Sequence, residues 1–390
     1  MIQAPATLGM LGGGQLGRFF VLAAHEMGYK VWVLDPDANS PAGVAADRHL
    51  HAAYDDFAAL DEMARNCAAI TTEFENVPAG TLEYLAKFVP VHPSADAVAI
   101  CQNRVAEKSF LRNNGIPHAP FTAINTEADL RGVPDELFPA ILKVARFGYD
   151  GKGQARVKTR EEAIAAFQSF QNEGCVLEKM LSLDYEVSVV LARTEEGDVR
   201  SFAPSENLHT NGILDVSTSP LRSGNASTIN EAVALATRIA EKLGYVGTLG
   251  VEFFVAGDTL YVNEMAPRPH NSGHFTLDAC VTDQFEQQVR ALAGLPLGDA
   301  RAHSASVMVN LLGDVWYDPS RPGADAHGLY REPDWSLLTR EPNLKLHLYG
   351  KHHARPGRKM GHFTVVDADP QRAHDIAMAA RHAIGIRDDE

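Results

Sequence analysis

One stretch decides the fold of this chain: Ile141-Leu142-Lys143-Val144-Ala145-Arg146-Phe147-Gly148-Tyr149-Asp150-Gly151-Lys152-Gly153-Gln154-Ala155-Arg156-Val157. It begins with an apolar run that carries one lysine, which predicts a buried strand. Three glycines then alternate with polar residues before a second short apolar run. Glycine exposes backbone N–H groups to a ligand, and such groups beside Lys143 and Lys152 suit a polyphosphate. The stretch therefore predicts two strands joined by a phosphate-binding loop, and the alternative is a flexible hairpin tip.

Size and composition restrict the class of protein. The chain has 390 residues, enough for two or three domains. A net charge of −15 argues against a nucleic-acid surface. The four cysteines have no Cys-x-x-Cys spacing, which is typical of a reducing compartment without structural zinc. No apolar run is long enough to span a bilayer, so we expect a cytoplasmic protein with no membrane partner.

A strand–turn–helix unit is predicted at residues 6–27. Gly12, Gly14 and Gly17 satisfy the pattern G-x-G-x-x-G, and Asp35 ends the next predicted strand. In a dinucleotide-binding fold this acid would bind the ribose, so nicotinamide or flavin binding is one alternative. The other is that the glycines only allow close packing of the helix on the strand.

Residues 71–78 follow a predicted strand of the same unit. Ligands of open α/β sheets bind at the carboxyl ends of the strands. Glu73 and Asn76 could therefore hold the amine and hydroxyls of a polar ligand, although Asn76 could equally cap the following helix.

Charged residues punctuate the middle of the chain. Residues 95–113 are predicted to form one helix on which Arg104 and Lys108 share a face, either solvated or in contact with phosphate. Strands are predicted at 175–180 and 185–192, and Glu186 begins the second. Glu186 could bind ribose hydroxyls while the segment before it pairs with a purine edge. The alternative is a surface carboxylate.

Two glutamates lie on a predicted hairpin formed by residues 247–255 and 260–265. A three-residue loop would place Glu252 opposite Glu264, whereas a loop of two or four residues would pair Glu252 with Asn263. Opposed carboxylates repel, so an apolar hairpin that keeps them needs a cation. Carboxylate oxygens favour Mg²⁺. The alternative is two acids on a solvated face.

The segment after this hairpin is rich in proline and in hydrogen-bond donors. Arg268, Asn271 and His274 indicate an anion site more than a zinc site. A second basic cluster follows a predicted strand at 344–349 and contains Lys351, Arg355, Arg358 and Lys359. Such a cluster suits a phosphate monoester, unless it is only a solvated turn.

Together these segments resemble the ATP-grasp superfamily and, within it, the 5-(carboxyamino)imidazole ribonucleotide synthetases. The resemblance rests on residues 12–18, 72–78, 148–154, 263–274 and 349–351. It implies a mixed α/β and α+β fold with a Rossmann-like N-terminal domain, a two-lobed ATP-grasp centre and a small β-rich C-terminal domain. The implied limits are 1–95, 96–182 for the small lobe, 183–305 for the large lobe, and 306–390.

The resemblance also implies roles for individual residues. ATP would contact Arg104, Lys143, Gly148, Tyr149, Asp150, Gly151, Lys152, Gly153, Gln154, Glu178, Lys179, Met180, Leu181, Glu186, His209, Asn263 and Glu264. Magnesium would be held by Glu252 and Glu264. The ribonucleotide would contact Gln15, Glu73, Asn76, Arg268, Asn271, His274, Lys351 and Arg358. Bicarbonate would be surrounded by Tyr149, Asp150, Lys152, Arg268 and Lys351.

The implied activity is that of an ATP-dependent carbon–nitrogen ligase of purine biosynthesis. Bicarbonate and ATP would give carboxyphosphate, which carboxylates 5-aminoimidazole ribonucleotide. The glycine turn would then serve the ribonucleotide rather than NAD, Asp35 would have no assigned role, and a homodimer is expected. The alternatives are a formate-dependent glycinamide ribonucleotide transformylase, an NAD-dependent dehydrogenase and a non-catalytic nucleotide sensor.

Overall fold

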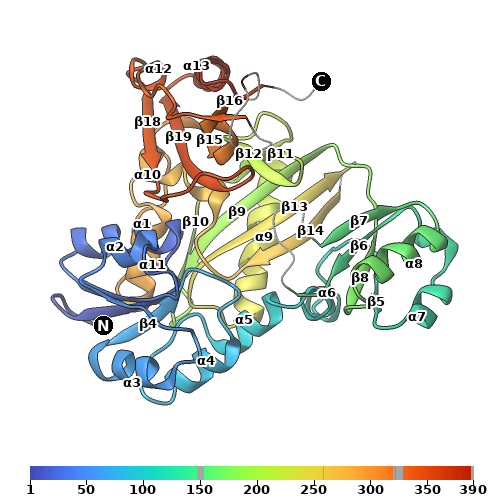
Figure 1. Cartoon of the computed structure of the whole chain (residues 1–390), viewed down its shortest axis with the longest axis horizontal. Helices are drawn as coiled ribbons and strands as arrows, with labels where there is room; N and C mark the ends of the chain where they lie inside the picture. Colours follow the sequence, from blue (N-terminus) through green and yellow to red (C-terminus); the bar gives the residue numbers. More distant parts are fainter. Residues whose placement is uncertain (147–152, 258, 319–320, 322–327, 388–390) are drawn as a thin grey trace.

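The structure is a computed structural model of the whole chain, and it describes residues 1–146, 153–257, 259–318, 321 and 328–387. Three bodies surround a long central sheet (Figure 1). The N-terminal body is blue, the C-terminal body, in red, lies above it in this view, and the small lobe, in green, lies to the right. No described helix combines the length and apolar character that a membrane crossing requires.

The N-terminal body is an open parallel sheet with the strand order β3-β2-β1-β4. Its strands are β1 (Thr7–Leu11), β2 (Lys30–Leu34), β3 (Arg48–Leu50) and β4 (Ala69–Thr72), and its helices are α1 (Gln15–Glu26), α2 (Pro41–Ala45), α3 (Phe57–Asn66) and α4 (Ala79–Leu85). Successive side chains of a strand face opposite sides of its sheet. Met10 accordingly packs in the core that contains α1 residues, while Leu11 packs in the core beneath α3 and α4. The expected Rossmann-like arrangement is confirmed.

The small lobe is an antiparallel sheet with the order β5-β8-β6-β7. Its strands are β5 (Phe121–Ile124), β6 (Ala140–Val144), β7 (Gln154–Val157) and β8 (Cys175–Lys179), and its helices are α5 (Ala95–Cys101), α6 (Arg104–Asn113), α7 (Glu127–Arg131), η1 (Asp135–Leu137) and α8 (Arg160–Ser169). Strands β6 and β7 pair with Lys143 opposite Gln154, as the opening stretch predicted.

The prediction of a single helix at 95–113 is wrong, because the helical conformation is interrupted between α5 and α6. Asn103 leaves the helical conformation, with φ −128° and ψ 112°, and its side chain accepts hydrogen bonds from the N–H groups of Val105 and Ala106. The Gln102 amide donates to the carbonyls of Glu75 and Val77 at 2.7 and 2.6 Å. An asparagine cap therefore starts a second helix and turns Arg104 into its first residue.

The central sheet has the strand order β14-β13-β9-β11-β12-β15-β19-β18, and β10 pairs with β9. The strands are β9 (Tyr185–Arg193), β10 (Val199–Ser201), β11 (Ser205–Thr210), β12 (Ile213–Ser219), β13 (Gly247–Ala256), β14 (Thr259–Ala266), β15 (Ala305–Leu312), β18 (Leu344–Leu348) and β19 (Lys359–Asp367). Because β12 pairs with β15, this sheet runs without a break across the expected boundary at 305/306.

The remaining elements cover this sheet and connect its strands. They are α9 (Ala226–Lys242), η2 (Asn271–Gly273), α10 (Thr276–Ala279), α11 (Gln284–Ala293), η3 (Gly313–Trp316), β16 (Tyr317–Asp318), β17 (Leu329–Tyr330), α12 (Ser336–Thr339) and α13 (Pro370–Ala383). Helix α11 joins the N-terminal body to the central sheet. Its Gln288 side chain accepts from the Thr248 N–H of β13 and donates to Thr71 Oγ1 of β4 at 2.6 Å. The edge of the first sheet is thereby fixed against the central sheet.

Candidate functional site

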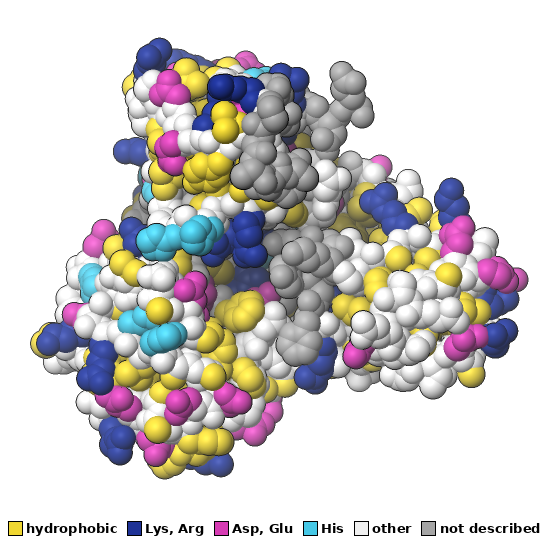
Figure 2. Space-filling view, in the orientation of Figure 1, with side chains coloured by type: hydrophobic (Ala, Val, Ile, Leu, Met, Phe, Trp, Pro, Cys, Tyr) yellow, Lys and Arg dark blue, Asp and Glu magenta, His cyan; other side chains and the backbone are white. Residues whose placement is uncertain are grey.

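A cavity of about 1140 Å³ lies where the three bodies meet. Figure 2 shows a hollow between them with Lys or Arg side chains gathered beside it. The predicted ATP and metal residues that line the cavity are Arg104, Lys143, Gln154, Glu186, His209, Glu252, Asn263 and Glu264. The predicted ribonucleotide residues that line it are Gln15, Glu73, Asn76, Arg268, Asn271, Lys351 and Arg358. Segments more than 300 residues apart in the sequence therefore share one cavity.

The carboxylate hairpin reaches its register in a way that loop length alone does not predict. Ala256 pairs with Thr259, so the loop has two residues, for which regular pairing would set Glu252 opposite Asn263. Instead, a β-bulge makes Asn263 the extra residue of β14, and Glu252 lies opposite Glu264. A bulge re-aims the side chains beside it, and here it produces the carboxylate pair.

The environment of this pair favours a bound cation. Glu252 is largely buried, which together with the charge of Glu264 raises the pKa of Glu252 to about 7. Asn263 Nδ2 donates to Glu252 Oε2 at 3.3 Å, and His270 Nε2 lies 3.3 Å from Glu252 Oε1. Arg104 Nη1 lies 3.4 Å from Glu264 Oε2. Two facing carboxylates and an amide oxygen form a donor set that fits Mg²⁺.

Lys143 lies in the cavity wall and is held by a buried carboxylate. Its Nζ is 3.3 Å from Glu178 Oε2, and Lys108 Nζ is 3.4 Å from the same oxygen. Burial alone would raise the pKa of Glu178, but the two ammonium groups lower it to about 2, so the carboxylate stays ionised. Burial lowers the pKa of Lys143, and the contact with Glu178 opposes that effect. Glu178 therefore orients Lys143.

Lys108 is not the solvated or phosphate-binding residue that its helical spacing suggested. Its side chain is 1 % exposed, and Nζ donates to the carbonyls of Val262 and Asn263 at 3.2 and 2.8 Å. It lies behind the cavity wall rather than among the described residues that line the cavity.

The rest of the predicted nucleotide residues divide into two groups. Glu186 and His209 meet in the cavity, with Oε2 and Nδ1 2.9 Å apart. Burial alone would lower the pKa of His209. The nearby carboxylates of Glu186 and Glu252 raise it by more, so the net shift of this pKa is upward. By contrast, the cavity reaches Leu183 and, among described residues, does not include 178–181.

Two backbone N–H groups of the predicted adenine hinge already have partners. Lys179 donates to the Pro120 carbonyl at 2.8 Å, and Met180 donates to the Pro139 carbonyl at 2.9 Å. Gly148, Tyr149, Asp150, Gly151 and Lys152 lie outside the described residues. Gly153, the last loop glycine, has φ +69° and accepts at its carbonyl from the Val144 N–H at 2.8 Å.

The glycine turn before α1 is closed by a carboxylate of the chain itself. Glu73 Oε1 and Oε2 accept from the N–H groups of Gly14 and Gly17 at 2.5 and 2.8 Å, although burial raises the pKa of Glu73. A Cβ on Gly14 would lie 2.6 Å from that carboxylate. The glycine pattern is therefore explained by the close approach of Glu73.

Asp35 also turns toward the glycines. It accepts from the Gly13 N–H at 2.7 Å and from the Tyr54 hydroxyl at 2.8 Å. Its contacts hold the turn, which gives this residue a structural task that the sequence left unassigned. Asn76 lines the cavity, and the helix cap of α4 is Pro78, so the capping alternative for Asn76 is wrong.

The ribonucleotide side of the cavity contains one residue, Glu75, that the sequence analysis did not identify. Arg268 makes a two-pronged ion pair with Glu75, through Nε to Oε2 and through Nη2 to Oε1 at 3.1 Å. Asn271 is buried in the cavity wall, and no described residue hydrogen-bonds to its side-chain amide. Glu75 sits two residues after Glu73 at the same strand end, and this position could have identified it.

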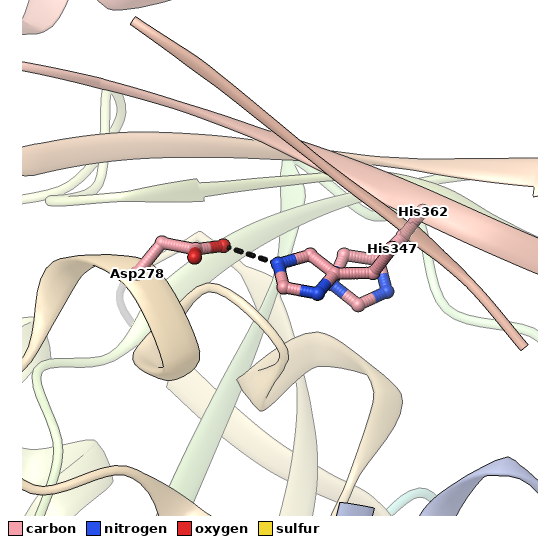
Figure 3. A group of neighbouring side chains, drawn as sticks. All are labelled: Asp278, His347 and His362. Carbon is pink, nitrogen blue, oxygen red and sulfur yellow. Dashed lines mark hydrogen bonds and ion pairs between the residues drawn. The ribbon is translucent and has the colours of Figure 1, made fainter.

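His274 does not lie among the described residues that line the cavity. Its ring stacks on His362 at 4.6 Å between centroids, and His362 in turn stacks on His347 at 4.6 Å. Figure 3 shows His347 paired with Asp278 and the His362 ring stacked on that of His347. Burial lowers the pKa of His274 to about 3. His274 is thus a packing residue between the bodies rather than a donor for an anion.

The basic cluster at the C-terminal end of the cavity is present as expected. Lys351 and Arg358 line the cavity together with Arg355 and Lys359. Lys351 Nζ donates to the Lys359 carbonyl at 2.7 Å, and Arg358 Nη1 donates to the His353 carbonyl at 2.8 Å. Burial and the neighbouring Arg355 lower the pKa of Arg358. This end of the cavity therefore carries concentrated positive charge in an acidic protein.

Comparison with protein families finds three matches that follow one another along the chain. They are a ribonucleotide synthetase preATP-grasp domain at residues 5–102, an ATP-grasp domain at 109–285 and a phosphoribosylaminoimidazole carboxylase C-terminal domain at 306–375. The chain is 44 % identical to the N5-carboxyaminoimidazole ribonucleotide synthase of Brucella melitensis, over 94 % of this chain and 97 % of the relative. It is 40 % identical to that of Bacillus subtilis, over 94 % and 93 %.

Solved structures agree with these matches. The N5-carboxyaminoimidazole ribonucleotide synthetase of Thermus thermophilus superposes with a TM-score of 0.87 at 35 % identity, covering 98 % of this chain and 100 % of the other. The Aspergillus clavatus enzyme in complex with ADP and 5-aminoimidazole ribonucleotide superposes with a TM-score of 0.86 at 31 % identity, covering 97 % and 98 %. With the shared cavity, the carboxylate pair and these full-length similarities together, the chain belongs to the family of N5-carboxyaminoimidazole ribonucleotide synthases.

Proposed function

We propose that this protein carboxylates the amine of 5-aminoimidazole ribonucleotide with bicarbonate, using MgATP and releasing ADP and phosphate. One observation carries the proposal: Lys143, the Glu252–Glu264 pair and the Arg268–Asn271 wall line a single cavity. The Aspergillus relative that binds ADP together with 5-aminoimidazole ribonucleotide supports both substrates. The dehydrogenase and formate-dependent alternatives find no support in the family matches.

The nucleotide triphosphate is expected along the wall that carries Lys143, Arg104 and Gln154. Glu186 and His209 would receive the ribose, and the glycine loop would cover the phosphates. Glu252 and Glu264, with Asn263, would hold Mg²⁺, which supplies charge neutralisation for the transferred phosphoryl group. The charges on the cavity wall support this orientation, because the carboxylate pair and Lys143 face the same space.

The ribonucleotide is expected at the opposite wall. Its phosphate would be held by Lys351 and Arg358, where the charge of the wall is most positive. Its amine would lie near Glu73 and Asn76. Arg268 and Lys351 would hold bicarbonate and then the new carboxylate. Glu75 keeps the Arg268 guanidinium in one orientation, as a bidentate ion pair does.

The chemistry begins with attack of a bicarbonate oxygen on the γ-phosphorus of ATP. Lys143 stabilises charge that builds on the transferred group. The resulting carboxyphosphate reacts with water, so a closed cavity is required until it yields CO₂ and phosphate. The exocyclic amine then attacks CO₂ inside the same space, and the proton lost from nitrogen leaves with a basic group of the cavity or with phosphate.

The test measures ADP release by the purified enzyme with bicarbonate and Mg²⁺, with and without 5-aminoimidazole ribonucleotide. We expect ATP hydrolysis to depend on the ribonucleotide and to fall in Glu264→Gln at a Mg²⁺ concentration that just saturates the wild type. An equal rate of ATP hydrolysis with and without the ribonucleotide would overturn the assignment. Activation by formate and glycinamide ribonucleotide instead would point to the sister transformylase, and nucleotide binding without turnover would point to a sensor.

A further inference from the structure

The bulge in β14 interrupts the hydrogen bonding between β14 and β13 at Asn263. Strand β14 is the edge strand of the central sheet, and its ladder partner is β13. On its other side, Val262 forms an isolated parallel bridge with His118. At the bulge, the register passes from Phe253–Val262 to Glu252–Glu264, and Asn263 is left without a partner residue on β13. A bulge disrupts the ladder, and buried carbonyls must find partners elsewhere.

Lys108 supplies those partners from outside the sheet. Its Nζ donates to the carbonyls of Val262 and Asn263, at 3.2 and 2.8 Å. In a regular strand, consecutive carbonyls point to opposite edges. Here two consecutive carbonyls point toward one ammonium group on α6. The side chain therefore takes the place of a neighbouring strand at the point where the ladder is broken.

Other contacts from the same side of the small lobe complete this attachment. The Met265 N–H donates to Glu107 Oε1 at 2.5 Å, and the Val262 N–H donates to the Pro117 carbonyl at 2.9 Å. Burial raises the pKa of Glu107 to about 7, with Lys108 lowering it in opposition. The strand is thus hydrogen-bonded to the small lobe both before and after the bulge residue Asn263, and Lys108 is the residue that contacts the two carbonyls at the bulge.

Lys108 also contacts the other half of the site. Its Nζ lies 3.4 Å from Glu178 Oε2, and that same oxygen lies 3.3 Å from Lys143 Nζ. One buried ammonium therefore connects the backbone of the carboxylate strand to the carboxylate that orients Lys143. A shift of this ammonium would move Glu264 relative to Glu252 and would change the partner of Lys143 at the same time.

We propose that Lys108 is a positioning residue for the reaction: it holds the bulge at Asn263 that sets Glu264 opposite Glu252, and it couples this register to Lys143. Lys108 touches neither substrate nor metal in this role. The inference rests on the proposed function of the carboxylate pair as the Mg²⁺ site. It assigns a task to a lysine whose place on its helix suggested only solvent or phosphate.

The test replaces the ammonium and measures metal binding apart from turnover. Mn²⁺ binding to the full-length enzyme with ADP is followed by electron paramagnetic resonance. For Lys108→Met we expect Mn²⁺ affinity to fall about tenfold, as for residues that orient metal ligands. The half-saturating Mg²⁺ concentration should rise by a similar factor in the ATPase assay. The KM for 5-aminoimidazole ribonucleotide should stay as in the wild type, because that substrate is expected at the opposite wall.

A matched control removes another buried cation, one that is not among the described residues that line the cavity. Arg381 of α13 pairs with Asp215 of β12 at 2.6 Å and is 2 % exposed. Arg381→Met should lower thermal stability without changing Mn²⁺ affinity. Lys108→Gln keeps one donor for the bulge carbonyls and should give an intermediate Mn²⁺ affinity. It supplies the comparison even where Lys108→Met does not fold.

Three outcomes decide the question. Wild-type Mn²⁺ affinity in Lys108→Met or Lys108→Gln, with stability lowered as in Arg381→Met, would overturn the positioning role. Wild-type Mn²⁺ affinity in Glu264→Gln would overturn both the metal assignment and the role of Lys108. Weakened Mn²⁺ binding in the Lys108 variants, in an enzyme whose ATP hydrolysis ignores the ribonucleotide, would support the role of Lys108 and refute only the proposed carboxylation.

Discussion

Acid is expected to destabilise this protein through the stacked histidines His274, His362 and His347, which lie beside Phe19 of the N-terminal body. His274 is fully buried, and burial lowers its pKa from the ordinary value of 6.5 to about 3. Burial also lowers the pKa of His362, the ring stacked against it. In both cases the folded state keeps the imidazole neutral while the unfolded state binds a proton near pH 6.5. Stability is therefore complete above pH 6.5 and is lost progressively as the pH falls toward 3.

The magnitude for His274 follows from proton linkage. Between pH 7.5 and 5.0 the unfolded state gains nearly one proton at this residue and the folded state gains almost none. One such group lowers the free energy of unfolding by about 2 kcal/mol over this interval. For an unfolding entropy of about 2.1 cal/mol/K per residue, this corresponds to about 2 to 3 °C in melting temperature.

The assay compares melting temperatures of the wild type and His274→Gln at pH 7.5 and 5.0. The variant loses ring packing and should melt lower at both values, but its drop on acidification should be about 2 to 3 °C smaller. Phe285→Leu is the control, because Phe285 packs on the same ring at 5.8 Å and does not titrate. That variant should be destabilised equally at both pH values. A drop in His274→Gln as large as that of the wild type would refute the neutral, buried state of His274.

Three further predictions concern the cavity and the break before α6. Glu264→Gln should raise the half-saturating Mg²⁺ concentration by at least about tenfold in a Mg²⁺ titration of ATP hydrolysis, since one carboxylate of the pair is lost; an unchanged titration would contradict a metal role. Arg268→Lys should keep the charge but lose the two-pronged pair with Glu75, reducing carboxylation by about tenfold or more at unchanged Mg²⁺ dependence; activity equal to the wild type would show that the fork geometry is irrelevant. Asn103→Ala should lower the free energy of unfolding by about 1 kcal/mol, because the cap of α6 is removed, while Asn103→Ser should recover most of it; equal stability of the two variants in urea titrations would contradict the capping role.

Local patterns predicted the elements of the cavity well, because each of those patterns reflects a short-range cause. The strand–loop–strand unit around Lys143 follows from an apolar run, glycines and a second apolar run, and β6 and β7 pair accordingly. The carboxylate hairpin also formed where it was predicted. The helix predicted at 95–113 failed, because Asn103 offers its own side chain to the backbone and so competes with continuation of the helix.

The roles of single polar residues were harder to predict, because they depend on what burial brings to each side chain. Lys108 and Arg104 lie one helical turn apart, yet Lys108 is buried behind the wall and Arg104 lines the cavity. His274 has the same local signature of a loop donor as Asn271, but the arrival of β18 and β19 stacks rings against it. No local pattern records which distant strand will cover a given side chain.

The sequence by itself determined the periodic elements, the glycine turns and the presence of two acids on one hairpin, since these depend on residues close together in the chain. Only the tertiary structure decided the register of those acids. The two-residue loop alone would pair Glu252 with Asn263, and the bulge that corrects this pairing is held by an ammonium 154 residues away in the sequence. The physical reason is that a broken ladder leaves carbonyls which must be satisfied, and the partner that satisfies them arrives only when the small lobe packs against the sheet.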